Sequence, residues 1–235
     1  VYNGAAWVFG LAGLIAVVVG TTAYRAMDDR PGSRLHSDLF SLWIDRRMPE
    51  MRAAGADVFV NIATPKFAAQ AIKKVGELGW HPVHIMTNVS ASPAAVMKPA
   101  GAENSKGVLS AGYQMIVTDP VFEATAGMKR FRAFMEKYYP DADKAESGPL
   151  SAWNASNALV EVLKKCGNDL TRENVMKQAA SIKDLQLDML LPGIKVNTSP
   201  TDFGPIQQEQ LQVFKGEGWQ LFGEIFDARG AAKTN

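Results

Sequence analysis

Twenty consecutive residues near the start of the chain, Ala5 to Tyr24, include no charged side chain. As an α-helix, this run would be about 30 Å long, which matches the hydrocarbon core of a lipid bilayer. Aromatic side chains stand at both ends, with Trp7 near the start and Tyr24 at the end, as is common at membrane interfaces. We therefore predict one transmembrane helix over residues 1–26.

Within this segment, small residues recur at every fourth position, at Ala12, Ala16 and Gly20. In a transmembrane helix they would share one face, and small side chains let a second helix approach closely. We expect this face to pack against an integral membrane partner. Two other interpretations stay open, an uncleaved signal peptide and a buried helix. A signal peptide normally has basic residues ahead of a shorter apolar run, and neither feature is found here.

Residues 27–50 are predicted to form a juxtamembrane linker. The polar stretch after the apolar segment is interrupted by Pro31-Gly32, a pair that is typical of loops. The short apolar run from Leu39 to Ile44 could form a turn of helix at the membrane surface or pack on the domain that follows. We favour packing on the domain.

From Met51 onward, short apolar runs alternate with amphipathic helices. The run Asp57–Ala63 is typical of a strand buried on both faces of a parallel sheet. A helix that begins after Thr64-Pro65 and ends at Gly79 leads to a second strand, Val83–Met86. This order predicts a βαβ unit, and hence an α/β fold in which helices flank a parallel sheet. The further expected elements are a strand over 107–116, helices over 124–139, 149–166 and 171–182, and a hairpin over 210–221.

Composition excludes several classes of function. Lys and Arg number 25 against 24 Asp and Glu, so the net charge of +1 argues against a nucleic-acid-binding protein. The single cysteine, Cys166, excludes an internal disulfide, and its place on a predicted helix favours a buried apolar role. His81 and His84 have no cluster of carboxylates or cysteines beside them, so we predict no metal site. Without a phosphate-binding glycine loop or a catalytic motif, we predict neither an enzyme nor a cofactor.

The stretch AAGADVFVNIATPKFAAQAIKKVGELGWHPVHIMTN, with GVLSAGYQMIVTDP, FMEKYYPDAD and DLTRENVMKQAASIKDL further on, resembles the second half of type I periplasmic substrate-binding proteins. More narrowly, it resembles the receptors of ABC importers for branched-chain amino acids or aromatic acids. In that family, two α/β lobes close on a ligand. The resemblance implies a partial fold of this type over 51–229, preceded by the transmembrane helix. Residues 51–118 and 206–229 would belong to one lobe, 119–205 would supply elements of the other, and 230–235 would be a tail.

The resemblance also implies ligand-binding residues in the loops after two successive strands. They fall at Thr64, with Lys66 and Phe67 beside it, and at Asn88, with Ser90 beside it. Family members that bind an α-ammonium group have an acidic residue at the second position, and neutral Asn88 cannot make that charge-assisted bond. Lys66 is either a counter-charge for a carboxylate or a solvated residue of the first helical turn. We therefore expect a small organic acid in preference to an amino acid.

Two functions are compatible with these features. The first is a membrane-tethered solute receptor of an ABC importer, with a permease as partner. The second is a single-span accessory subunit of a larger membrane complex, in which the domain serves for docking, because the N-terminal half of the family has no counterpart here. Arg25, Arg30 and Arg34 follow the apolar segment and would place the domain in the cytoplasm. The family works outside the cytoplasmic membrane, and we follow it in predicting a periplasmic domain anchored in a bacterial inner membrane.

Overall fold

The computed structural model describes residues 7–10, 13–19, 32–142 and 147–228. The chain divides into two compact units, which we call unit 1 (Val1–Ala111 with Gln212–Gln220) and unit 2 (Gly112–Leu211 with Leu221–Asn235). The lobes expected from the sequence instead change at residues 118–119 and 205–206.

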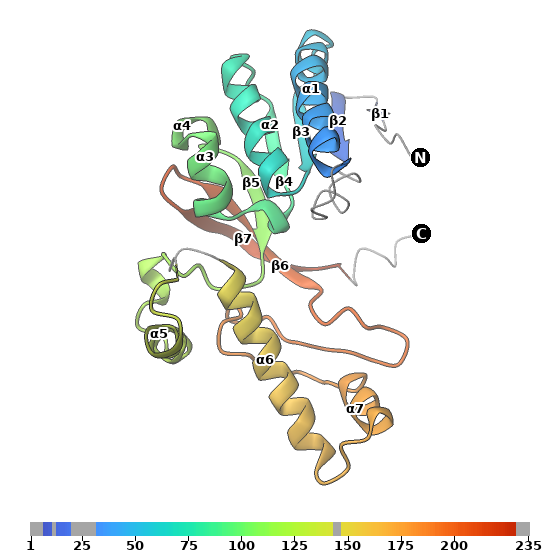
Figure 1. Cartoon of the computed structure of the whole chain (residues 1–235), viewed down its shortest axis with the longest axis vertical. Helices are drawn as coiled ribbons and strands as arrows, with labels where there is room; N and C mark the ends of the chain where they lie inside the picture. The colour runs from blue at the N-terminus through green and yellow to red at the C-terminus, as the bar shows by residue number, and fades with distance from the viewer. Residues whose placement is uncertain (1–6, 11–12, 20–31, 143–146, 229–235) are drawn as a thin grey trace. The chain divides into compact units, whose positions relative to one another are not determined.

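Parallel strands form the centre of unit 1 (Figure 1). β2 pairs in parallel with β3, β3 with β4, and β4 with β5, whereas β1 is antiparallel to β2. The sheet continues through a C-terminal hairpin, so that its seven strands follow one another in chain order. The strands are β1 (Trp7–Gly10), β2 (Gly13–Val19), β3 (Val58–Ile62), β4 (Val83–Met86), β5 (Leu109–Gly112), β6 (Gln208–Phe214) and β7 (Trp219–Asp227).

The apolar N-terminal segment forms strands where we predicted a transmembrane helix. Residues Ile15 to Val19 of β2 pair with Val58 to Ile62 of β3. A β-branched run such as Val17-Val18-Val19 favours a strand, and an uncharged run suits a parallel strand as well as a membrane helix. Across the part of the chain that the structure describes, we find no helix with both the length and the apolarity needed to cross a bilayer.

Of the three small residues assigned to the helix-packing face, the structure describes Ala16. Ala16 lies in β2, opposite Trp7 of β1 and Phe59 of β3. Ala12 and Gly20 lie outside the described residues.

A long helix occupies most of the predicted linker. α1 (Gly32–Ala53) includes Pro49 and directs Ile44, Met48 and Met51 into the core. Their spacing of four and three residues is that of one helix face. The burial of Ile44 agrees with the favoured interpretation, in which the apolar run packs on the domain.

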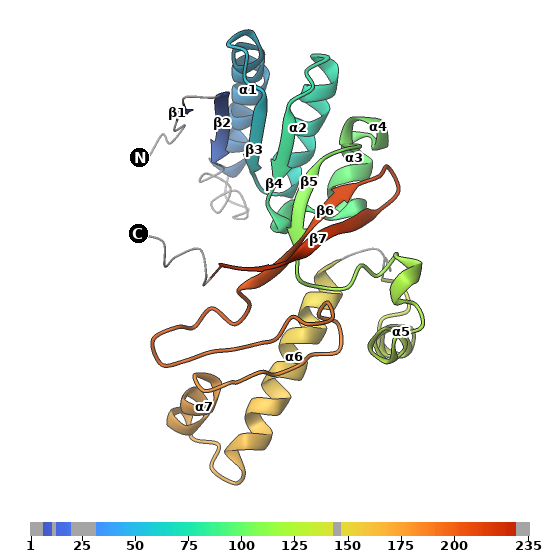
Figure 2. The ribbon, with the colours of Figure 1, turned by 180° about the vertical axis from the view of Figure 1, so that it is seen from behind.

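The predicted βαβ unit is confirmed. Between β3 and β4 lies α2 (Pro65–Glu77), whose inner face is apolar, and Trp80 after it donates from Nε1 to the Ala56 carbonyl at 2.9 Å. Short helices α3 (Lys98–Ala100) and α4 (Ala102–Ser105) follow β4. Opposite views show α1–α4 on one side of the strands (Figures 1 and 2).

The two faces of this sheet differ in burial. Phe59, Asn61, His84 and Met86 are buried on one face, whereas the alternate positions Ile62, Val83 and Ile85 are exposed. Successive strand residues point to opposite faces, so the apolar run of β3 supplies both a core layer and an open apolar layer.

Unit 2 is built on the three helices expected from the sequence, α5 (Ala126–Tyr138), α6 (Ser147–Cys166) and α7 (Arg172–Ala179). Met128, Phe131 and Met135 of α5 are buried, as is Cys166 of α6. The loop after α7 closes the core, since the Met115 amide donates to the Met189 carbonyl at 2.9 Å. The predicted hairpin, whose turn belongs to unit 1, is also confirmed, with Lys215 N–H bonded to the Gly218 carbonyl at 2.9 Å.

Gly127, in the first turn of α5, provides a test of packing in unit 2. A Cβ atom at this position would meet the backbone carbonyl of Asp188, which has little room to move. We expect Gly127→Ala to lower the free energy of unfolding by about 1–3 kcal/mol, as overpacking does. Gly148→Ala in α6 is the control, because a Cβ there meets no described atom within 4 Å. It should range from neutral to about 1 kcal/mol stabilising in urea titrations, and equal effects at both sites would contradict the packing argument.

Candidate functional site

The predicted site residues lie after two neighbouring strands of unit 1. β3 and β4 run parallel with Asn61 opposite Met86, so the segments that leave them begin at the same edge of the sheet. The Thr87 amide donates to the Asn61 carbonyl at 3.1 Å and extends the pairing by one step. We call the segments 63–67 and 87–91 the first and second loops. Ligands of open parallel sheets bind at this carboxyl edge.

Thr64 is the N-cap residue of α2. Its extended backbone (φ −68°, ψ 163°) turns the chain into the helix, and its carbonyl accepts the Ala68 amide at 2.8 Å. The half-buried side chain makes no capping hydrogen bond to the described backbone of α2. Pro65 at the first helical position has no amide to satisfy, as is favourable there.

Lys66 and Phe67 differ in exposure. Phe67 is buried and belongs to the core between α2 and the sheet. Lys66 is exposed, and its ammonium lies 5.7 Å from the centre of the Phe67 ring. Only Lys66 of these two therefore presents a polar group at the surface of the first loop.

Asn88 and Ser90 belong to a turn of 3₁₀ helix, Asn88–Ser90, in the second loop. Asn88 is half-buried, and its carbonyl accepts the Ala91 amide at 3.1 Å. Ser90 is 0% exposed, and its hydroxyl donates to the Ala63 carbonyl at 2.5 Å. The Ser90 hydroxyl therefore contacts the first loop from within the protein.

Two buried polar residues beneath the loops were missed by the sequence-based prediction. Asn61 of β3 is 0% exposed; its Oδ1 accepts the Ala63 amide at 3.2 Å, and its Nδ2 lies 3.3 Å from Nε2 of His84. An amide nitrogen can only donate, so Nε2 accepts and the proton of neutral His84 is on Nδ1. The sequence does contain a signal for Asn61, because a polar asparagine stands within an otherwise apolar predicted strand.

The environment of His84 keeps it neutral. The ring is 5% exposed, and its centre lies 4.6 Å from that of Phe59. Burial lowers the pKa of His84 from 6.5 to about 3, because the charged form would lose its hydration. Among the described residues, no group of three His, Cys, Asp or Glu side chains could hold a metal ion. The bonding partner of the His84 ring is the side chain of Asn61.

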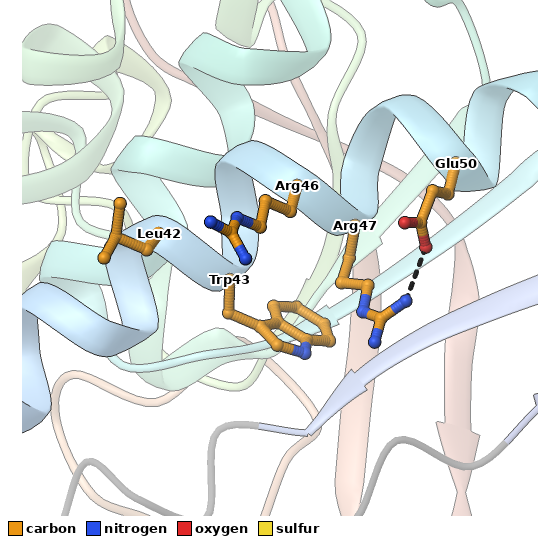
Figure 3. Close-up of a pocket in the computed structure, with 5 residues that line it drawn as sticks. All are labelled: Leu42, Trp43, Arg46, Arg47 and Glu50. Carbon is orange, nitrogen blue, oxygen red and sulfur yellow. Dashed lines mark hydrogen bonds and ion pairs between the residues drawn. The ribbon is translucent and has the colours of Figure 1, made fainter.

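A separate hollow of about 500 Å³ lies along α1 (Figure 3). Arg47 is bonded to Glu50 across one turn of the helix at 2.7 Å. The lining residues are Leu42, Trp43, Arg46, Arg47 and Glu50, and this described lining includes none of the predicted ligand-binding residues.

Residues 46–217, more than half of the chain, match the family described as periplasmic binding protein. The chain belongs to this family. Its members bind substrates and do not catalyse reactions. No curated protein matches the sequence.

Solved structures share the fold. A branched-chain amino acid ABC transporter protein from Thermus thermophilus, with bound valine, has a TM-score of 0.69 at 16% identity over 91% of this chain and 60% of its own. A fatty acid ABC transporter substrate-binding protein from Thermomonospora curvata has a TM-score of 0.61 at 20% identity over 81% of this chain and 48% of its own. A leucine-binding protein from Thermotoga maritima has a TM-score of 0.56 at 13% identity over 81% of this chain and 49% of its own. The chain therefore spans between about half and 60% of the length of these proteins.

Proposed function

We propose that this chain contributes one ligand-binding surface of a solute receptor that serves an ABC importer. The observation that carries the proposal is the placement of Thr64, Lys66 and Asn88 on adjacent loops at the carboxyl edge of a parallel sheet. The family match and the ABC transporter proteins among its structural relatives support a small-molecule ligand and a membrane permease as partners. In this proposal, units 1 and 2 are parts of the two lobes, and the receptor acts in the periplasm.

The proposed ligand is a small organic acid that has no α-ammonium group. Asn88 offers an amide where an ammonium would require a carboxylate, and Lys66 offers a cation for the ligand's carboxylate. The structural relative described as a fatty acid receptor is compatible with such a ligand. Phe67 is buried and Ser90 bonds to Ala63, so we assign direct contacts to Thr64, Lys66 and Asn88 only.

Asn88 provides the test of this proposal. Titration calorimetry with 4-methylpentanoate and with L-leucine compares two ligands that differ only in the α-ammonium group. We expect the wild-type protein to bind the acid more tightly. Asn88→Ala should weaken binding by about 1 kcal/mol, roughly fivefold in Kd, because one hydrogen bond is lost. Asn88→Asp should shift the preference toward leucine, because a carboxylate can bind the ammonium.

Val89→Ala is the matched control for Asn88→Ala, because Val89 is exposed in the same turn and has no polar side-chain group. It should leave Kd unchanged. If Asn88→Ala unfolds unit 1, Asn88 has a structural role and the assigned contact is wrong. If neither acid nor amino acid binds the wild-type protein, the receptor function is wrong.

Docking to a partner protein is a second candidate function. It is favoured by the exposed apolar residues Ile62, Val83 and Ile85 on one face of the sheet and by Leu159 on α6. Parallel sheets are usually covered on both faces, so an apolar face of this kind suits a protein contact. The same calorimetry separates the two functions, because docking requires no solute.

A further inference from the structure

Four hydrogen bonds connect the two loops with each other and with the ends of β3 and β4. The Asn61 side chain accepts the Ala63 amide, and the Asn61 backbone carbonyl accepts the Thr87 amide. The Ser90 hydroxyl donates to the Ala63 carbonyl, and the Asn61 Nδ2 donates to His84 in the neighbouring strand. Both polar groups of the Ala63 backbone are therefore bound, one by the side chain of Asn61 and the other by that of Ser90.

These bonds involve polar side chains whose burial is energetically unfavourable without hydrogen bonds. Asn61 and Ser90 are each 0% exposed, and His84 is 5% exposed. A buried polar group destabilises a protein unless it is hydrogen-bonded, and an apolar residue could fill the same space. The sheet contains a comparison, because Phe59 and Met86 fill equivalent inward positions with apolar side chains. Asn61 and His84 are therefore polar at positions of this face where apolar side chains also fit.

The bonds also act across strands. Ser90 lies 27 residues after Ala63 along the chain, yet its hydroxyl reaches the Ala63 carbonyl at 2.5 Å. Ala63 directly precedes Thr64, and Ser90 closes the 3₁₀ turn that begins with Asn88. A movement of one loop away from the other would have to break this bond.

We propose that Asn61 and Ser90, with His84 orienting Asn61, are positioning residues that lock the first loop to the second and thereby set the distance between Thr64 and Asn88. The consequence for ligand affinity rests on the proposed function, whereas the lock itself does not. Ser90 thus acts through Ala63 and not by touching the ligand. A preset distance between two contact groups favours binding because less conformational freedom is lost when the ligand arrives.

Hydrogen exchange of the full chain, followed by NMR, tests the lock without any ligand. Ser90→Ala should speed exchange of the Thr87, Ser90 and Ala91 amides by about tenfold or more through local opening. The amide of Ile85, inside β4, should keep its wild-type exchange rate. Ser110→Ala is the matched control, because Ser110 is a buried serine of the same sheet whose hydroxyl bonds to the adjacent Ala111 carbonyl. It should leave both loops unchanged.

Variants of Asn61 separate positioning from simple packing. Asn61→Leu keeps the size of the side chain but removes the acceptor, so the Ala63 amide should exchange about tenfold faster or more. Asn61→Asp retains that acceptor and should restore protection of Ala63. In ¹⁵N spectra of the His84 ring, the wild-type protein should show the proton on Nδ1, and Asn61→Asp should change this protonation pattern.

The outcomes of exchange and binding are distinguishable. If exchange at the loops responds only to Ser90→Ala and Asn61→Leu, the lock is supported, whether or not a solute binds. If Ser90→Ala and Ser110→Ala have the same effect, or neither changes the loops, the lock is wrong. Calorimetry with 4-methylpentanoate then tests the consequence, and Ser90→Ala should raise Kd about tenfold while Ser110→Ala does not. Absence of binding to the wild-type protein would overturn the proposed function alone.

Discussion

Acidification from pH 7 to pH 4 is expected to lower the free energy of unfolding, with His84 accounting for about 3 kcal/mol of the loss. Burial lowers the pKa of folded His84 to about 3, against 6.5 for an ordinary histidine. Between these values the unfolded chain binds a proton that the folded protein does not. Stability therefore falls as the pH falls, by about 1.4 kcal/mol per pH unit.

The measurement is urea unfolding of the wild-type protein and of His84→Gln at pH 7 and pH 4. The variant lacks the titrating ring, so its loss of stability on acidification should be smaller by about 3 kcal/mol. His81→Gln, at an exposed histidine just before β4, is the control and should behave as the wild-type protein does. Equal pH dependence of the wild-type protein and His84→Gln would contradict the buried, neutral state of His84.

Phe131→Ala in α5 is expected to lower the free energy of unfolding by about 3–5 kcal/mol. Phe131 is 3% exposed within the core of unit 2, and its ring meets Trp153 edge-on at 5.9 Å between centres. Removal of the ring takes away buried apolar surface and leaves a cavity, and both effects destabilise the protein.

Phe134→Ala is the matched control because Phe134 lies on the same helix and also touches Trp153, at 5.0 Å between ring centres. Its side chain is 43% exposed, so we expect a loss of no more than about 1.5 kcal/mol. Urea titrations of both variants give the comparison. A loss for Phe134→Ala as large as that for Phe131→Ala would mean that the core of unit 2 extends over the face assigned to solvent.

Local patterns were sufficient to predict the βαβ unit and the helices of unit 2. The run from Asp57 to Ala63, the Thr64-Pro65 start and the Gly79 end each reflect a preference that acts within a few residues. The same pattern placed Thr64 and Asn88 after successive strands, and β3 and β4 are neighbours in the sheet. The contacts assigned to these residues stay a prediction.

The N-terminal segment shows where local pattern was insufficient. Its uncharged run suits a bilayer and the middle of a sheet equally well, because both environments exclude water. The presence of β3 as a partner for Ile15–Val19 decides between them, and that partner is some forty residues away along the chain. Similarly, α1 was assigned to a linker because of the Pro31-Gly32 pair, and the helical spacing of Ile44, Met48 and Met51 was not used.

The sequence was therefore enough for the βαβ unit, the helices of unit 2, the α/β class and the resemblance to periplasmic binding proteins. The tertiary structure was needed to find that Asn61, His84 and Ser90 bond beneath the loops, because their separations along the chain are 23 residues for the first pair and 27 for Ser90 and Ala63. The physical reason is that secondary structure depends on neighbours in the chain. The role of a buried polar side chain depends on the group that folding places beside it.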